Sequence, residues 1–284
     1  MTKFIFSLLF FAIQQQIYGQ CETKQGLETF SNRAYGKGNL VCNEKQDTWK
    51  YYDRKDRLIK EVSYKNGTLD GAYKVWYKTG QQKSIAFYTD NHLNGMVSNY
   101  TIEGQLIAES NYQNGKLHGS SKTWSETGVL LAEYTYEHGD KNGPFELFWI
   151  NGKTKEKGVY LKNQFDLRYE SFYENGRKSS LIEYENGLRN GTYITYFEDG
   201  TVSTSGNYSS GVQDGEWKIY YPAGALQSKG LYVQGVKSGL WEEWYINGAL
   251  QAKGMYNLGE RIGIWYEWAP NGKRKKLKYS EKTE

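Results

Sequence analysis

Histidines and carboxylates are the residues of this chain that could carry acid–base or metal chemistry. The histidines fall where turns are expected between repeated segments: His92, His118 and His138. No partner residue recurs beside them to orient a ring or to complete a ligand set. The carboxylates, such as Glu103, Glu174 and Asp199, are scattered singly, and no phosphate-binding loop, nucleophile elbow or zinc spacing is present. We therefore expect a protein that is not an enzyme and that has no cofactor and no metal site.

Two cysteines, Cys21 and Cys42, are the remaining reactive side chains, and both precede the repeated part of the chain. In an oxidising compartment their expected state is one disulfide that closes a short loop. Without a nearby pair of histidines they do not make a zinc site. Lipidation at Cys21 is an alternative, but it is disfavoured because Gln20 is not the small residue that such processing prefers.

Aromatic side chains recur at a fixed spacing and could form a binding surface. Steps of 24 from position 46 align the chain without gaps, with repeats that start at 46, 70, 94, 118, 142, 166, 190, 214, 238 and 262. The seventh place of each repeat is always aromatic, and Tyr and Trp are enriched at protein contacts. The candidate binding face carries six of these rings: Trp76, Trp124, Tyr196, Tyr220, Trp244 and Trp268.

Two further columns of the repeat predict how such rings are positioned. The eleventh place is glycine in every repeat except the first, which has Asp56. The nineteenth place is tyrosine in every repeat but the last, and we interpret this column as a structural aromatic ladder: Tyr64, Tyr88, Tyr112, Tyr136, Tyr160, Tyr184, Tyr208, Tyr232 and Tyr256. The fourth place is mostly aromatic as well, and its odd distance from the seventh predicts aromatic rings on both faces of a sheet.

Each repeat is predicted to be one β-hairpin. Residues 217–221 and 225–232 form two strand patterns, and in the second we expect Leu226, Gly230 and Tyr232 on one face. Turns are expected at dipeptides that tolerate positive φ, such as Asn186-Gly187 at one end and Asp214-Gly215 at the start of the next repeat. Leu167 replaces such a glycine, so the junction 161–168 is expected to contain a bend or an altered turn.

The predicted fold is all-β: an extended single-layer antiparallel meander of 24-residue β-hairpin repeats. No helical spacing of apolar residues is found between residues 46 and 280. The low apolar content, 38%, favours an open twisted ribbon without helices apart from the signal peptide, and closure of the sheet on itself is the alternative. The expected segments are a signal peptide (1–19), an N-terminal cap (20–45), the hairpin array (46–279) and a tail (280–284).

Residues 1–19 have the pattern of a signal peptide, with Lys3 before the apolar run 4–13 and Gly19 at the expected cleavage point. The mature chain is thus expected in the periplasm, on the cell surface or secreted. The formal charge of +4 is mild for 284 residues, and we expect no nucleic-acid partner.

The last predicted strand carries a basic cluster of Lys273, Arg274, Lys275 and Lys276. Lysines on an edge strand suppress edge-to-edge association, which is the favoured interpretation of this cluster. Contact with an acidic membrane surface is the alternative.

The columns of the repeat resemble those of the variant membrane occupation and recognition nexus repeat, the MORN repeat. They contain Asn-Gly, Trp or Tyr two residues later, Tyr-Tyr, Gly, Leu and a distant Tyr, and residues 214–224 fit closely. The resemblance covers about residues 46 to 279 and implies a hairpin array with a non-enzymatic scaffolding or binding role.

Together these features predict an exported repeat scaffold that binds a protein partner of the cell envelope through an aromatic-lined sheet face. Carbohydrate or cell-wall binding is the first alternative, because aromatic, Gly-rich repeats also resemble choline-binding and glucan-binding arrays. Peripheral binding to a lipid surface through the basic cluster is the second alternative.

Overall fold

The structure is a computed structural model that describes residues 21–280. The expected signal peptide and residues 281–284 of the expected tail lie outside the described residues. The chain divides into two compact units, Met1–Lys116 and Leu117–Glu284.

The first unit is built from short antiparallel strands that follow one another in the sheet. Its strands are β1 (Thr23–Thr29), β2 (Tyr35–Val41), β3 (Glu44–Tyr52), β4 (Leu58–Lys65), β5 (Thr68–Trp76), β6 (Gln82–Thr89), β7 (His92–Leu93), β8 (Gly95–Tyr100) and β9 (Leu106–Gln113). The expected cap therefore contributes β1 and β2 to the same sheet, and β2 pairs with β3 of the first repeat.

The second unit continues the same pattern from β10, which begins at the last residue of the first unit. Its elements are β10 (Lys116–Trp124), β11 (Leu130–Glu137), β12 (Asp140–Phe148), β13 (Thr154–Leu161), β14 (Gln164–Phe172), β15 (Lys178–Glu185), β16 (Leu188–Tyr196), β17 (Val202–Ser209), β18 (Val212–Tyr220), η1 (Pro222–Gly224), β19 (Leu226–Val233), β20 (Val236–Trp244), β21 (Leu250–Asn257), β22 (Glu260–Trp268) and β23 (Arg274–Lys278).

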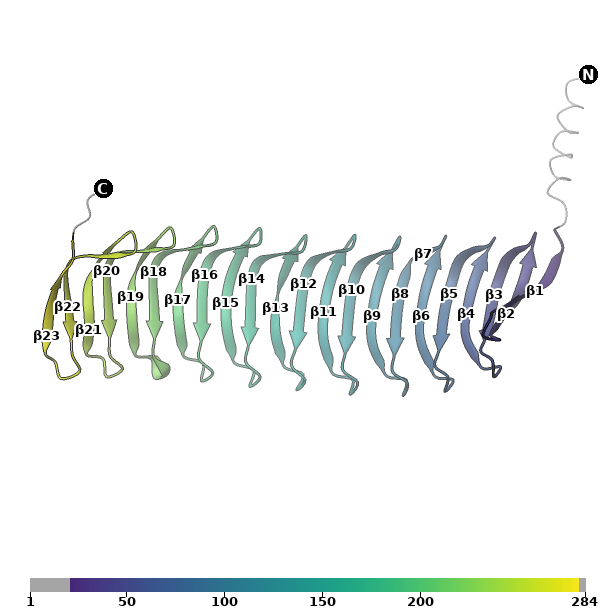
Figure 1. The fold of residues 1–284 in the computed structure, drawn as a ribbon, viewed down its shortest axis with the longest axis horizontal. Helices are drawn as coiled ribbons and strands as arrows, with labels where there is room; N and C mark the ends of the chain where they lie inside the picture. Colours follow the sequence, from purple (N-terminus) through teal and green to yellow (C-terminus); the bar gives the residue numbers. More distant parts are fainter. Residues whose placement is uncertain (1–20, 281–284) are drawn as a thin grey trace, which may run out of the picture. The chain divides into compact units, whose positions relative to one another are not determined.

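The predicted all-β meander is confirmed. Within each unit the strands follow one another in sequence order (Figure 1) and each pairs with its neighbours, except that both the two-residue β7 and β8 pair with β6. No pairing joins the first described strand to the last. Among residues 21–280 the sole departure from the expected absence of helix is η1, a single 3-10 turn that begins at Pro222.

Two kinds of turn alternate along the chain. At the eleventh-place glycine the chain turns tightly: in the first unit the N–H of Gly80 donates to the carbonyl of Tyr77 at 2.9 Å, and Gly80 has φ +92°. At the other strand ends a two-residue turn also ties one hairpin to the previous one. In the second unit, for example, the N–H of Gly235 donates to the carbonyl of Gln213 at 2.9 Å. Each repeat thus fixes the position of the next.

The core lies on one face of the sheet, named here the core face, which carries the fourth-place and nineteenth-place rings. In the second unit Trp217, Trp241 and Trp265 are buried there, and Trp265 is 0% exposed. The ring of Tyr232 stands edge-on between two of them, 5.9 Å from Trp217 and 5.2 Å from Trp241 between centroids. Such edge-to-face pairs are favoured by the ring quadrupoles, so the rings hold successive hairpins together.

Each of these indoles donates a hydrogen bond from its Nε1, and Trp241 and Trp265 also have a cation over the ring. The Nε1 of Trp241 donates to the carbonyl of Leu231 at 3.1 Å, and the Nζ of Lys237 lies 4.0 Å from the indole centroid. In the first unit Trp49 repeats the arrangement with the carbonyl of Asn39 at 2.9 Å. A buried indole needs such a partner, so the sites suit tryptophan in particular.

A glycine in the preceding strand makes room for each of these tryptophans, and the sequence columns did not reveal its role. A Cβ added at Gly230 would overlap the ring of Trp241, and a Cβ at Gly254 would overlap Trp265. Where the fourth-place ring is a tyrosine, a branched aliphatic residue can stand instead, as Ile182 does opposite Tyr193. At these positions a tryptophan is matched by a glycine, and Tyr193 by a larger aliphatic side chain.

Three local expectations were wrong, and strand bulges explain two of them. The dipeptides Asn142-Gly143, Asn190-Gly191 and Asp214-Gly215 lie inside β12, β16 and β18 and not in turns. Their glycines do have positive φ, 116° at Gly143 for example, but this conformation serves a bulge in the strand as well as it serves a turn.

Leu226 lies on the face opposite to Tyr232. The register of β18 and β19 shifts between Ile219 and Tyr220, so that Tyr220 pairs with Leu226. The shift inserts one extra residue, which breaks the simple alternation of faces.

The junction 161–168 contains no altered turn. Leu167 adopts φ +58°, the conformation of the glycines at the same place, and β13 pairs with β14 with the same kind of shift as the other hairpins. A left-handed leucine costs about 1–2 kcal/mol, and the surrounding hydrogen-bonded ladder maintains it. Its side chain is 61% exposed.

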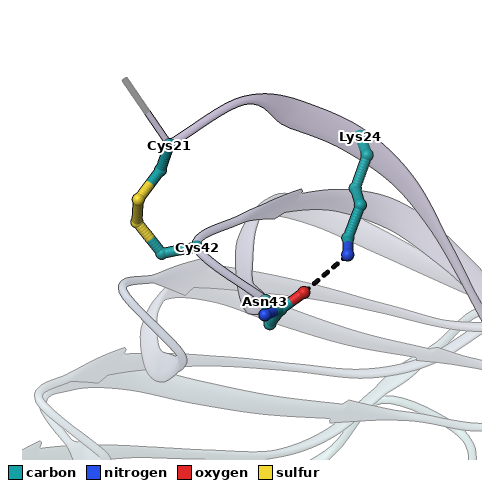
Figure 2. Close-up of a disulfide and its surroundings, with 4 residues drawn as sticks. All are labelled: Cys21, Lys24, Cys42 and Asn43. Atoms are coloured by element: carbon teal, nitrogen blue, oxygen red, sulfur yellow. Dashed lines mark hydrogen bonds between the residues drawn. A yellow bond between two sulfur atoms is a disulfide. The ribbon is translucent and has the colours of Figure 1, made fainter. Parts of the chain in front are cut away.

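The cysteines lie at the end of the sheet that begins with β1. A disulfide joins Cys21 to Cys42, and the Nζ of Lys24 donates to Oδ1 of Asn43 beside it (Figure 2). Together they fasten β1 to the turn between β2 and β3.

Candidate functional site

The structure places the three histidines at different kinds of position. His92 and His118 lie in β7 and β10 and not in turns as expected, whereas His138 occupies a turn with φ +52°. Among residues 21–280 there is no group of three or more His, Cys, Asp or Glu side chains that could hold a metal ion.

His118 has a structural explanation in the repeat. At the same place in other repeats, Asn142 accepts a hydrogen bond from the N–H of Lys162 at 3.2 Å, and Asn190 accepts one from Ser210 at 3.0 Å. The Nδ1 of His118 is buried and has no hydrogen-bond partner, and its ring lies 5.5 Å from that of His138 between centroids. The histidine thus occupies the position of a backbone-capping amide.

The seventh-place rings lie on the face opposite to the core face, named here the opposite face. All six predicted rings are half-buried: Trp76, Trp124, Tyr196, Tyr220, Trp244 and Trp268. An aliphatic side chain often pairs with the ring across the strands, as Leu130 does with Trp124 and Leu250 with Trp244. In each unit these rings therefore form a row near the eleventh-place turns.

The nineteenth-place tyrosines, from Tyr64 to Tyr256, are all half-buried on the core face. From Tyr160 onward they touch the fourth-place rings, as Tyr256 does with Trp265 at 5.1 Å between centroids. Burial raises the pKa of several of them, including Tyr64, Tyr160 and Tyr232. They pack between hairpins and offer little surface to a partner.

An eighth-place ring, which the sequence analysis did not single out, supports the seventh-place row. The hydroxyl of Tyr221 donates to the carbonyl of Trp244 at 3.0 Å, and that of Tyr245 donates to Trp268 at 2.7 Å. In the first unit Tyr77 donates to the carbonyl of Tyr100 at 2.9 Å. The recurrence of Tyr or Trp directly after the seventh place was the signal that could have revealed this contact. These hydroxyls hold the backbone under the seventh-place rings.

Beside the seventh-place row the opposite face carries paired charges. In the second unit Glu242 accepts from Lys253 at 2.7 Å and from Lys229 at 3.1 Å. The hydrogen bond from Lys253 is the main cause that holds the pKa of Glu242 below its usual range, and the bond from Lys229 adds to it. Glu242 is largely buried, whereas both lysines are more exposed, so the cations face the solvent.

A second carboxylate on this face, Glu170, lies among three cations: Lys178 at 2.6 Å, Arg168 at 2.7 Å and Lys157 at 3.4 Å. Burial raises the pKa of Glu170, but the hydrogen bond from Lys178 and the three positive charges outweigh burial and lower it. Three cations around one carboxylate leave this cluster positive on balance.

An apolar stripe crosses four consecutive strands on the opposite face of the second unit. It consists of Leu231 in β19, Leu240 in β20, Met255 in β21 and Ile264 in β22, each 39% to 45% exposed. These residues stand at the third and eighteenth places, which hold polar residues such as Ser120, Thr192 and Asn207 in other repeats. We name them the C-terminal stripe. The stripe was not predicted from the sequence, although the polar residues of these two columns are replaced by apolar ones in the last repeats.

Comparison with known families gives one match in two places. Residues 117–138 and 213–234 match the MORN repeat variant. Each match spans one hairpin of the second unit, β10 with β11 and β18 with β19, and the two begin four repeat lengths apart. The resemblance stated from the sequence columns is confirmed at these two places, and MORN repeat variants support a repeat scaffold.

Other comparisons carry no argument about function. No curated protein matches the chain. TarM is 13% identical over 55% of this chain at a TM-score of 0.18, and the chain spans 24% of its length. A porin-like protein from Bacteroides uniformis is 10% identical over 90% of this chain and 92% of its own, at a TM-score of 0.21. Virginiamycin B lyase from Staphylococcus aureus is 10% identical over 93% of this chain and 87% of its own, at 0.17. Among residues 21–280 no helix has the length and apolar character needed to cross a membrane.

Proposed function

We propose that the chain is an exported, non-enzymatic repeat scaffold that binds a protein partner through the opposite face of its second unit. The observation that carries this proposal is the C-terminal stripe. Contiguous exposed apolar side chains rimmed by polar residues mark interaction sites more often than isolated ones do. Export rests on the pattern of residues 1–19.

The burial of the rings supports the choice of this face. The fourth-place tryptophans are covered by neighbouring hairpins and their glycines, so they contribute to stability and not to binding. On the opposite face Trp244 and Trp268 are half-buried, and Glu242 and Tyr266 lie between them and the stripe along their strands. Large aromatic and aliphatic side chains that lie together and lose water on contact supply most of the free energy of protein association.

Carbohydrate binding is the second candidate, because the seventh-place rings recur every two strands, at about 10 Å, and sugar rings could stack on such a row. Cations already lie over some of these rings, however: Lys229 Nζ is 5.6 Å from the centroid of Trp244, and Lys157 Nζ is 5.5 Å from that of Phe172. Titration with wall polysaccharides would change the tryptophan fluorescence if sugars stacked there. Silence across a broad panel would remove this candidate.

The test of protein binding is capture from the cell envelope with residues 20–284 as bait. The variant Leu240→Ser with Met255→Ser removes the centre of the stripe. The control is Ile219→Ser, a substitution on the core face at a residue of similar exposure, 37%. A protein that the parent and the control capture, and that the stripe variant loses, supports the proposal. Equal capture by all three baits contradicts it.

A further inference from the structure

The C-terminal stripe is bordered by cations on its side toward β23. On the opposite face Ile264 pairs with Lys278, Tyr266 with Lys276 and Trp268 with Arg274. The guanidinium of Arg274 lies 4.8 Å from the centroid of Tyr266. Each residue that β22 places on this face, from the stripe to the seventh-place row, is therefore paired with a cation of β23. We name Arg274, Lys276 and Lys278 the basic rim.

Cations also lie along the side of the stripe toward the seventh-place row. Lys229 lies two residues from Leu231 in β19, and Lys253 lies two residues from Met255 in β21. Both lysines form ion pairs with the largely buried Glu242. One carboxylate between two lysines leaves an excess of positive charge. The stripe is thus apolar at its centre and positive on two sides.

We propose that the C-terminal stripe and the basic rim form a docking site for an acidic apolar protein segment, in which large apolar side chains are interleaved with aspartate or glutamate. This inference rests on the proposed protein binding and specifies the chemistry of the partner. The apolar side chains of the segment would cover Leu240 and Met255, while its carboxylates would meet the rim. Complementary charge steers association and fixes the register of the segment.

A second copy of this chain fits the site less well. Face-to-face packing about a two-fold axis parallel to the strands would bring the lysines of one copy against those of the other. An axis across the strands would bring Lys229 and Lys253 against a row that holds the exposed, apolar Val233 and Val236 and one carboxylate, Glu260. Each arrangement leaves more cations than carboxylates at the contact, so the site suits a different chain that carries carboxylates.

The experiment is a selection of peptides from a displayed random library, with residues 20–284 as the target. Peptides are then tested against Leu240→Ser with Met255→Ser, against Lys276→Glu with Lys278→Glu, and against the control Ile219→Ser. We expect the recovered peptides to be rich in Asp and Glu between large apolar residues. We expect each of the first two variants to weaken their binding by roughly tenfold or more, and the control to leave it unchanged. The rim substitutions lie on exposed side chains of the edge strand, so they test the site without disturbing packed residues.

Higher salt should weaken binding of these peptides to the parent and have less effect on the rim variant, because screening acts on exposed charges. Stripe-dependent peptides that are neutral or basic would overturn the inference while leaving protein binding intact. Recovery of no stripe-dependent peptide would also overturn it. Flotation with phosphatidylserine vesicles gives the remaining outcome. Vesicle binding that both variants abolish, without peptide binding, would assign the site to a lipid surface and refute the inference.

Discussion

Replacing Gly230 by alanine is expected to destabilise the second unit by about 2 kcal/mol. The added Cβ would overlap the indole of Trp241, and overpacking of this kind costs about 1–3 kcal/mol. If the ring moves away, it loses its bond to the carbonyl of Leu231 at 3.1 Å, which contributes about 1 kcal/mol. It also loses edge-to-face contacts with Tyr232 and Tyr256, about 1 kcal/mol each. Alanine recovers about 0.4–1 kcal/mol because it restricts the unfolded chain.

The repeats themselves provide the compensating change. In the second unit Ile182 stands opposite Tyr193, and in the first Val62 stands opposite Tyr73. The pair Gly230→Ile with Trp241→Tyr should therefore recover about 2 kcal/mol relative to Gly230→Ile alone. Residues in contact are coupled by amounts of this size, about 0.5–3 kcal/mol.

Urea unfolding and amide hydrogen exchange would measure these effects. Exchange is needed because an array in which each repeat contacts its neighbours need not unfold as one unit. Amides of β18 to β21 should lose protection in Gly230→Ala, whereas the control Ser228→Ala, on the same strand, should change little. If Gly230→Ala were as stable as the parent, or if the double variant were no more stable than Gly230→Ile alone, the size-matching argument would be refuted.

Three further predictions concern other parts of the chain. His118→Asn should raise the unfolding free energy by about 1 kcal/mol, because an amide at this place can accept a hydrogen bond from the N–H of His138, as Asn142 accepts one from Lys162 in its own repeat; an unchanged melting temperature would contradict this. Cys42→Ser should destabilise the first unit by about 3 kcal/mol and speed hydrogen exchange chiefly in β1, since the disulfide fastens that strand; uniform or unchanged exchange would argue otherwise. Burial raises the pKa of Tyr169 to about 12 from 10.0. The unfolded tyrosine therefore loses its proton first, and the unfolding free energy should be constant below pH 10 and fall between about pH 10 and 12. Urea midpoints against pH test this, and a phenolate titration of the folded protein that is complete near pH 10 would refute it.

The 24-residue period determined the fold class from the sequence alone. Glycine at the eleventh place and Asn-Gly pairs such as Asn186-Gly187 marked real turns, because positive φ is costly for most other residues. The odd spacing of the fourth and seventh places predicted that Trp241 and Trp244 lie on opposite faces of the sheet, and they do. These inferences succeeded because they depend on one strand or one turn at a time.

The bulges and the exposed surface were decided by the tertiary structure. Asp214-Gly215 has the composition of a turn but lies in a strand, and the register shift at Tyr220 moves Leu226 to the other face. The repeat pattern does not distinguish the buried Trp241 from the exposed Leu240 next to it. Exposure depends on what the adjacent strand places over a side chain, here Gly230 beneath the indole. The exposure of a side chain therefore depends on the register between strands, and the residue pattern within one strand does not determine that register.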